Sequence, residues 1–455
     1  MKRLLTALVL LTASASSIVA QASQPSTTDR RARSDDLAQL VEWANLEQSF
    51  SAARRAQALE IISGHRTAGT AFSDAEFYME IRRIVALADN GHSNVSDRPV
   101  HEAFGLVPIR VYWFSDGLRV VRARSAQREF LGSRIDGIEG LPLAEMENRL
   151  REFHGGTRAF FRRYSAQALM LSPALLHAVG LSRSPRELRL SLVTEDDERQ
   201  EVTLAVDFSS SSVHARPWRQ LVPTPIAGED DWVTVLDPSS KLPLYLLDEE
   251  ARFRSVPLKD GALIYIQLRS NVGSDDEPID EFTSQVQESL REGFPHSIIL
   301  DNRQNGGGDL SETAKFALGL SSLTYSGGRV YVITGSGTFS AGIYTSFYPK
   351  AADAERTLIV GEPVGDRARF WAETGAPFRL GDSGYHIGYA LQLHDVAAGC
   401  PDPKICHMMG YPEAWNMAVG SLDPDWPVAT RFADYAAGSD PVLERILEAV
   451  AEEIP

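Results

Sequence analysis

The chain has 455 residues, a length typical of two to four domains. Its 61 Asp and Glu residues outnumber its 45 Lys and Arg residues, and the formal net charge of -16 argues against a nucleic-acid partner. Apolar residues make up 43% of the sequence, as expected for a globular protein.

Residues 1–22 have the pattern of a secretory signal peptide. Met1, Lys2 and Arg3 precede an apolar run at residues 4–11, and Ala20 and Ala22 form a small-residue cleavage pattern. The run is too short to span a bilayer as a stable anchor. We therefore expect an exported protein, periplasmic or secreted, without a stable membrane anchor.

Residues 35–100 are predicted to form an N-terminal helical domain. Ser73 and Glu76 form a capping box, and apolar residues follow at helical spacing. Gly91 fits the position just after the helix end, which would fix the direction of His92. The alternative for His92 is a structural contact with the last helix carbonyls.

Residues 104–208 are predicted to form an α+β module with strands at 109–114, 118–121, 188–192 and 202–206. The four serines at 209–212 begin a predicted linker, 209–240. Strands and helices alternate over residues 241–455, which predicts an α/β domain whose last helix has Pro441 in its first turn.

Three glycines, Gly306, Gly307 and Gly308, lie between a buried strand at 297–301 and a helix. Such a loop turns its N–H groups outward and can hold an oxyanion. No Lys-Ser/Thr pair follows, which argues against a nucleotide-binding loop.

Ser340 lies in a similar turn, between an apolar strand at 329–334 and a helix. A serine there faces the positive end of a helix dipole, which suits a nucleophile, although a helix-capping serine is the alternative. The N–H of Ala341 and that of Gly307 or Gly308 would bind the oxyanion of an acyl transfer.

The motifs at 301–308, 337–342, 358–365 and 422–428, in this order, resemble the tail-specific protease (C-terminal-processing peptidase) family of serine peptidases. The resemblance covers about the last half of the chain. It implies a crossed ββα-spiral catalytic core, Ser340 as the nucleophile, protein or peptide substrates, and no cofactor or metal. It also makes residues 104–208 similar to the PDZ-like module of that family, with an unrelated α+β domain as the alternative.

One branch of this family uses a lysine as the base, at the position that Asp366 occupies here. The other branch, which includes the tricorn core protease, uses a histidine from a Gly-His-Ser/Thr motif. Gly91, His92 and Ser93 match that motif, so the resemblance implies that His92 is the base. The activity of the protein is then expected to fall as the pH drops through about 6.5, the usual pKa of histidine.

The base needs an acidic partner that orients it. Glu373 is our preferred residue, with Glu362 and Asp366 as alternatives; a solvated loop carboxylate is the other interpretation of Glu373. Near the closing segment, where the tricorn-type glutamate lies, this sequence has no acid.

Cys400 and Cys406 are the two cysteines of the chain, and export predicts that they form a disulfide. A metal site made by these thiols with His407 is the less favoured alternative.

The sequence thus predicts an exported serine peptidase. A different possibility is an α/β-hydrolase-type esterase, which would take its base from His386, His394 or His407, but Thr338 breaks the nucleophile motif of that fold. A catalytically inactive peptide- or ligand-binding homologue is the third.

Overall fold

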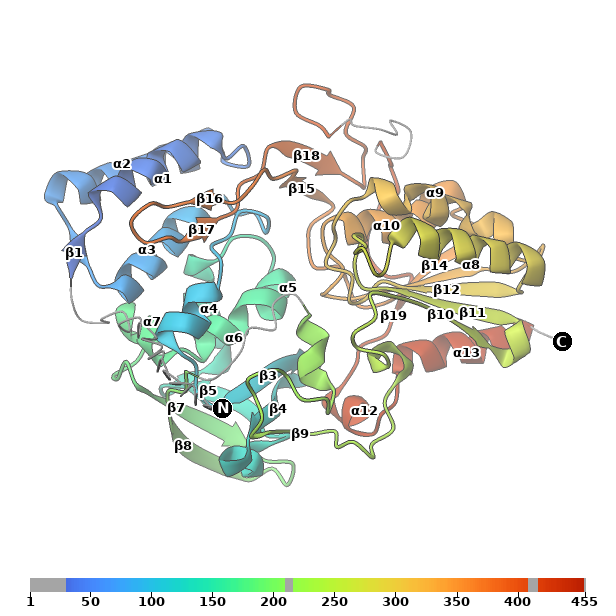
Figure 1. Ribbon diagram of the computed structural model, residues 1–455, viewed down its shortest axis with the longest axis horizontal. Coiled ribbons are helices and arrows are strands. Elements are labelled where there is room, and N and C mark those ends of the chain that lie inside the picture. The colour runs from blue at the N-terminus through green and yellow to red at the C-terminus, as the bar shows by residue number, and fades with distance from the viewer. Residues whose placement is uncertain (1–29, 209–215, 408–415, 454–455) are drawn as a thin grey trace, which may run out of the picture.

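The computed structural model describes residues 30–208, 216–407 and 416–453. The predicted signal peptide and the serines at 209–212 lie outside these ranges. Figure 1 shows the N-terminal helices and an antiparallel sheet on one side, and a mostly parallel sheet with its helices on the other. No helix of the described residues is long and apolar enough to cross a membrane.

The mostly parallel sheet comes from the C-terminal half of the chain, and its strands stand in sequence order. β10 is antiparallel to β11, and all later neighbours are parallel. The strands are β10 (Phe253–Leu258), β11 (Leu263–Leu268), β12 (Ser297–Asp301), β13 (Val330–Thr334), β14 (Thr357–Gly361) and β19 (Trp426–Pro427). Every residue of β12 and β13 is buried, as expected for parallel strands that are covered on both faces.

Helices cover both faces of this sheet (Figure 1). α8 (Ile279–Gly293), α9 (Ser311–Gly319) and α10 (Ala341–Ala352) share one apolar core with Leu300 and Val332. α13 (Pro441–Glu453) packs on the other face, against Tyr331. The predicted α/β class is confirmed, and the carboxyl ends of β12 and β13 bring the glycine loop and Ser340 to the same edge.

The second sheet is antiparallel and follows the order β3-β4-β5-β7-β8. Its strands are β3 (Ile109–Phe114), β4 (Gly117–Arg124), β5 (Arg134–Ile138), β7 (Glu187–Val193) and β8 (Arg199–Ala205), with β6 (Leu141–Pro142) on β5 and β9 (Trp232–Thr234) on β4. Between β6 and β7 lie α4 (Leu143–Leu150), α5 (Arg158–Phe160), α6 (Ala166–Met170) and α7 (Pro173–Ala178). The PDZ-like assignment and the domain boundaries stay predictions.

The described part of the predicted linker differs from a solvated connection. It contributes β9, and Trp218, Leu221 and Leu236 are buried in a small cluster with Phe432 and Tyr435 of α12 (Phe432–Ala436). The apolar side chains of this segment drive the packing, because they would otherwise be exposed to water.

The N-terminal helices are α1 (Ser34–Leu46), α2 (Ala52–Ala68) and α3 (Asp74–Ala86), with β1 (Arg31–Ala32) and β2 (Ala71–Phe72) beside them. The capping box of Ser73 and Glu76 is present. α3 ends earlier than the sequence predicts: Leu87 is its C-cap, and Gly91 lies in the turn that follows. The reversal uses Asp89, whose φ of 49° is left-handed.

Two hairpins from the C-terminal third reach toward these helices (Figure 1). They are β15 (Arg369–Ala372) with β18 (Gln392–Asp395), and β16 (Phe378–Arg379) with β17 (His386–Ile387). Trp43 of α1 donates a hydrogen bond to the carbonyl of Gly388, just after β17, at 2.9 Å. Segments far apart in sequence thus form one continuous core.

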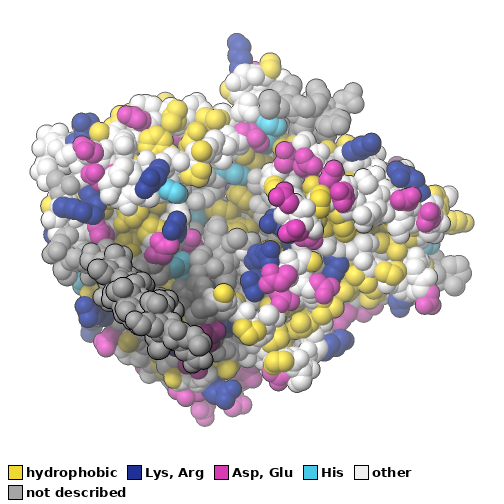
Figure 2. Space-filling view, viewed as in Figure 1, with side chains coloured by type: hydrophobic (Ala, Val, Ile, Leu, Met, Phe, Trp, Pro, Cys, Tyr) yellow, Lys and Arg dark blue, Asp and Glu magenta, His cyan; other side chains and the backbone are white. Residues whose placement is uncertain are grey.

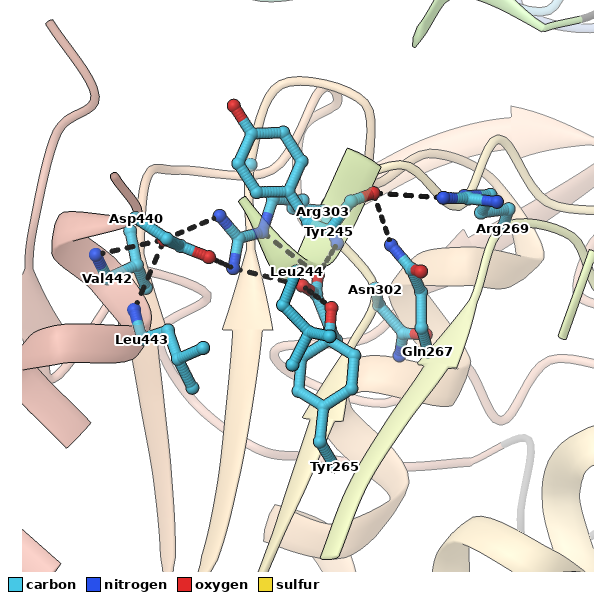
Figure 3. A network of polar contacts seen from close by, with 12 residues as sticks. Leu244, Tyr245, Tyr265, Gln267, Arg269, Asn302, Arg303, Asp440, Val442 and Leu443 are labelled. Carbon is cyan, nitrogen blue, oxygen red and sulfur yellow. Dashed lines mark hydrogen bonds and ion pairs between the residues drawn. The ribbon is translucent and has the colours of Figure 1, made fainter. Parts of the chain in front are cut away.

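A buried polar network ties the end of β12 to α13 (Figure 3). Arg303 binds Asp301 with Nε at 3.0 Å and Asp440 with Nη1 at 2.9 Å, and its guanidinium lies 4.5 Å from the ring centre of Tyr245. Two carboxylates offset the cost of burying this cation.

On the outside, acidic and basic side chains are interspersed over the face that Figure 2 shows.

Candidate active site

Ser340 occupies a strained turn at the N-terminus of α10. Its φ and ψ are 55° and -129°, and its side chain makes no capping hydrogen bond. A non-glycine residue at such a φ costs about 1–3 kcal/mol, which is typical of positions held for function. The alternative of a helix-capping serine is therefore not supported, and the half-buried hydroxyl is left for other chemistry.

The glycine loop lies directly against this turn. A Cβ on Gly307 would lie 2.7 Å from Cβ of Ser340 and 3.1 Å from the backbone N of Ala341, so only glycine fits. The Gly307 N–H already donates to Oδ1 of Asn305 at 3.0 Å. Among the described residues, the N–H groups of Gly308 and Ala341 have no acceptor, which favours them as the oxyanion donors.

Buried asparagines hold the two turns together. Asn305 accepts the Phe339 N–H on its carbonyl, and its side chain donates to Oδ1 of Asn271 at 2.8 Å. Asn271 in turn donates to Oγ1 of Thr345 in α10 at 2.7 Å. We did not single out Asn271 from the sequence. Its one signal is its place just after β11, a third strand that ends at this edge.

His92 packs beside the nucleophile turn. Its ring stacks on Phe339, the neighbour of Ser340, with centroids 4.5 Å apart, and a Cβ on Gly91 would lie 3.1 Å from the Phe339 ring. Arg367 binds the Asp89 carboxylate at 2.9 Å and its carbonyl at 2.8 Å, which ties the turn after α3 to the loop after β14. Domain packing thus brings His92 and Ser340 near each other.

His92 has no hydrogen bond on either ring nitrogen among the described residues. Its side chain is 10% exposed. Burial, helped by the charge of His394 and opposed by that of Glu373, lowers the pKa of His92 to about 3. The imidazole is therefore neutral at neutral pH, as a general base must be, and the fall in activity expected near pH 6.5 cannot come from its own ionisation in this state.

Among the described residues, Asp366 has the carboxylate that lies within ion-pair distance of a His92 ring nitrogen. Its Oδ2 lies 3.9 Å from Nδ1 of His92, and both atoms are buried without a hydrogen-bond partner among the described residues. Burial raises the pKa of Asp366 to about 6, although the Arg367 N–H and charge oppose this. At neutral pH the group is mostly ionised and faces a neutral imidazole.

Glu373, the predicted partner of His92, contacts two other histidines. Its Oε1 lies 3.3 Å from Nε2 of His394, and its Oε2 lies 3.7 Å from Nδ1 of His407. The sequence could not reveal this contact, because only the pairing of β15 with β18 brings the two histidines to Glu373. The other alternative, Glu362, accepts the Thr430 N–H at 3.2 Å and so has a structural contact.

Among the described residues, no hydrogen bond joins any of the three downstream histidines to Ser340. His386 is exposed on β17, Nδ1 of His394 bonds to the Tyr344 hydroxyl at 2.9 Å, and Nδ1 of His407 bonds to Gln392 at 2.9 Å. Cys400 and Cys406 form a disulfide in the structure, so their thiols cannot bind a metal.

A cleft of about 370 Å³ opens beside Gly307 and Phe339. Aromatic side chains line part of it, including Phe160, Tyr164 and Trp218. Its lining thus includes the glycine loop and the residue that precedes Ser340.

Solved structures with a similar fold include mature CPAF. The complex of mature CPAF with lactacystin matches with a TM-score of 0.55 and 12% identity, covering 92% of this chain and 98% of that chain. A second structure of mature CPAF matches with a TM-score of 0.53 and 13% identity, covering 92% and 97%. This chain has the fold of CPAF.

The photosystem II D1 C-terminal processing protease matches with a TM-score of 0.39 and 13% identity, over 90% of this chain and 98% of that chain. No protein-family model and no curated protein matches the sequence. The two CPAF matches show the fold, whereas the relationship to C-terminal-processing peptidases rests on the motifs.

Proposed function

We propose that this protein is an exported serine peptidase that cleaves peptide bonds through an acyl-enzyme on Ser340. The observation that carries the proposal is the left-handed, uncapped Ser340 at the start of α10, packed against Gly307. The motif resemblance and the CPAF fold support it. Export rests on the predicted signal peptide.

Neutral His92 is the general base of the proposed mechanism. It accepts the Ser340 proton as Oγ attacks the substrate carbonyl, and the N–H groups of Ala341 and Gly308 bind the oxyanion. Each such donor lowers the barrier by about 3 kcal/mol. His92 then passes its proton to the leaving amine, and a water molecule hydrolyses the ester by the same steps in reverse order.

Asp366 is the orienting acid that we propose, in place of Glu373. The imidazolium forms only during the reaction, and an ionised carboxylate at Nδ1 stabilises it there. The 3.9 Å distance between His92 Nδ1 and Asp366 Oδ2 is longer than a hydrogen bond, and a small shift on substrate binding would close it. The two unpaired buried atoms favour that shift.

The decisive experiment compares the wild-type protein with Ser340→Ala. The wild type is expected to react with a serine-directed fluorophosphonate and to degrade an unfolded protein, whereas Ser340→Ala does neither and keeps its melting temperature. Proteolysis by Ser340→Ala at the wild-type rate would refute the proposal. Cleavage of short acyl esters without any proteolysis would favour the esterase, and no labelling of a folded wild type would favour an inactive binding homologue.

A further inference from the structure

Glu373, His394 and His407 form a cluster that the proposed peptidase reaction does not use. One ligand atom from each residue lies within 4.8 Å of the others. Glu373 follows the end of β15, His394 lies in β18, and His407 follows the disulfide. Three elements thus converge on one point.

The backbone fixes these three residues before any ligand arrives. Ala372 pairs with Gln392 and Phe370 with His394 in the β15–β18 ladder, which places Glu373 at its end. The N–H of His407 donates to the carbonyl of Leu393 at 3.1 Å, beside the Cys400–Cys406 disulfide. Such a preformed arrangement lowers the entropy cost of holding an ion.

His394 directs an unused nitrogen at the cluster. Its side chain is 2% exposed, and Nε2 makes no well-aligned hydrogen bond although Oε1 of Glu373 is 3.3 Å away. Its other nitrogen, Nδ1, bonds to the Tyr344 hydroxyl at 2.9 Å. Metal-binding histidines generally have such an outer hydrogen bond, which fixes the tautomer and the ring orientation.

The spacing suits a small transition-metal ion. Zinc bonds of about 2.0–2.2 Å at tetrahedral angles place neighbouring ligand atoms roughly 3.3–3.5 Å apart. In the structure, Oε1 of Glu373 lies 3.3 Å from Nε2 of His394, and Oε2 lies 3.7 Å from Nδ1 of His407. Nδ1 of His407 would exchange its bond to Gln392 for the ion. Two imidazoles and one carboxylate are also a ligand set that Zn²⁺ favours over Mg²⁺ or Ca²⁺.

The cluster is linked to the base by stacked rings. His407 stacks on His394 with centroids 5.2 Å apart, His394 on Phe370 at 5.0 Å, and Phe370 on His92 at 5.5 Å. An ion on His394 and His407 would therefore stiffen the rings against which His92 packs.

We propose that Glu373, His394 and His407 bind one divalent transition-metal ion, with Zn²⁺ as the best match, which anchors the β15–β18 hairpin and through Phe370 the position of His92. The ion is not a reactant in peptide cleavage. The proposal is independent of the peptidase reaction, because the cluster and its contacts exist whether or not Ser340 is a nucleophile.

The test uses the full chain with Ser340→Ala, which prevents self-digestion, after removal of metals with a chelator. Titration calorimetry with ZnCl₂ is expected to show one site per chain, and thermal denaturation a higher melting temperature with Zn²⁺. In the same background, His407→Gln should weaken Zn²⁺ binding by about tenfold or more, whereas the exposed His386→Gln should not. MgCl₂ serves as the hard-cation control.

Glu373→Gln keeps the shape of the side chain and removes a ligand charge, so it tests the site if His407→Gln fails to fold. It too should weaken Zn²⁺ binding with an unchanged melting temperature in the absence of metal. Failure of the parent chain to bind Zn²⁺, or equal binding by the parent, His407→Gln and Glu373→Gln, would overturn the proposal. Neither result depends on whether the protein is a peptidase.

Discussion

The Ser340 turn and the His92 side chain lie side by side but are held by different forces. Hydrogen bonds from Asn305 and Asn271 fix the first, and its backbone is strained. Ring stacking on Phe339 and Phe370 holds the second, and both His92 nitrogens lack partners among the described residues. The nucleophile and its amide donors are thus preorganised, whereas the base can still move toward its partners.

The largest effect is expected from removing the base. His92→Gln should lower kcat/KM by about 10⁴–10⁶-fold, since residues of a catalytic unit act together. The matched control is His386→Gln, an exposed histidine that should keep the wild-type rate. Steady-state proteolysis assays measure both variants. A slow His386→Gln variant with a fast His92→Gln variant would show that His386, and not His92, is the base.

Asp366→Asn should come next, with a loss of about 10²–10⁴-fold in kcat, because the amide cannot stabilise the imidazolium. Glu373→Gln should lose far less, since its carboxylate contacts His394 and His407.

The pH profile sharpens this distinction. Asp366 ionises at about pH 6, so wild-type kcat/KM should fall as the pH drops through 6, and Asp366→Asn should lack this limb. A larger loss in Glu373→Gln than in Asp366→Asn would restore Glu373 as the orienting acid.

Gly307→Ala tests the contact between the two strand ends. The new Cβ would meet Ser340 at 2.7 Å, and the φ of 102° is unfavourable for alanine. We expect a destabilisation of about 1–3 kcal/mol and at least a tenfold loss of activity. Gly293→Ala is the control, because nothing lies within 4 Å of its Cβ position. Urea unfolding and proteolysis assays measure both effects.

The smallest expected effect is on how the free energy of unfolding changes with pH. His92 has a folded pKa of about 3 and an unfolded pKa near 6.5, so the unfolded state binds more protons between these values. This contribution to stability is complete above pH 6.5 and is lost as the pH falls toward 3. The free energy of unfolding of His92→Gln should therefore fall less between pH 7 and pH 4 than that of the wild type, by about 2–3 kcal/mol.

Asp366 changes the free energy of unfolding with pH in the opposite direction to His92. Its folded pKa of about 6 lies above the usual value of 3.8, so its contribution is present below 3.8 and is lost as the pH rises through 6. Asp366→Asn should lose more stability than the wild type on going from pH 7 to pH 4. Parallel shifts of both variants would show that neither group is buried in the way that the structure has it.

The sequence by itself determined the local parts of this protein. Strand, glycine turn and helix follow one another within about twenty residues at both Gly307 and Ser340, and the capping box of Ser73 and Glu76 is equally local. Backbone preferences and hydrophobic periodicity act at this range, so the α/β class and the turn that holds the nucleophile could be predicted.

Tertiary structure decided what lies next to what. Gly91 was expected to end α3, but its small size serves a close approach to Phe339, and Leu87 ends the helix. Glu373 was preferred over Asp366, but the register of β15 on β18 turns Glu373 to two histidines and leaves Asp366 beside His92. These outcomes depend on packing between residues from 21 positions apart (Glu373 and His394) to 274 positions apart (His92 and Asp366), and local sequence patterns carry no information about such pairings.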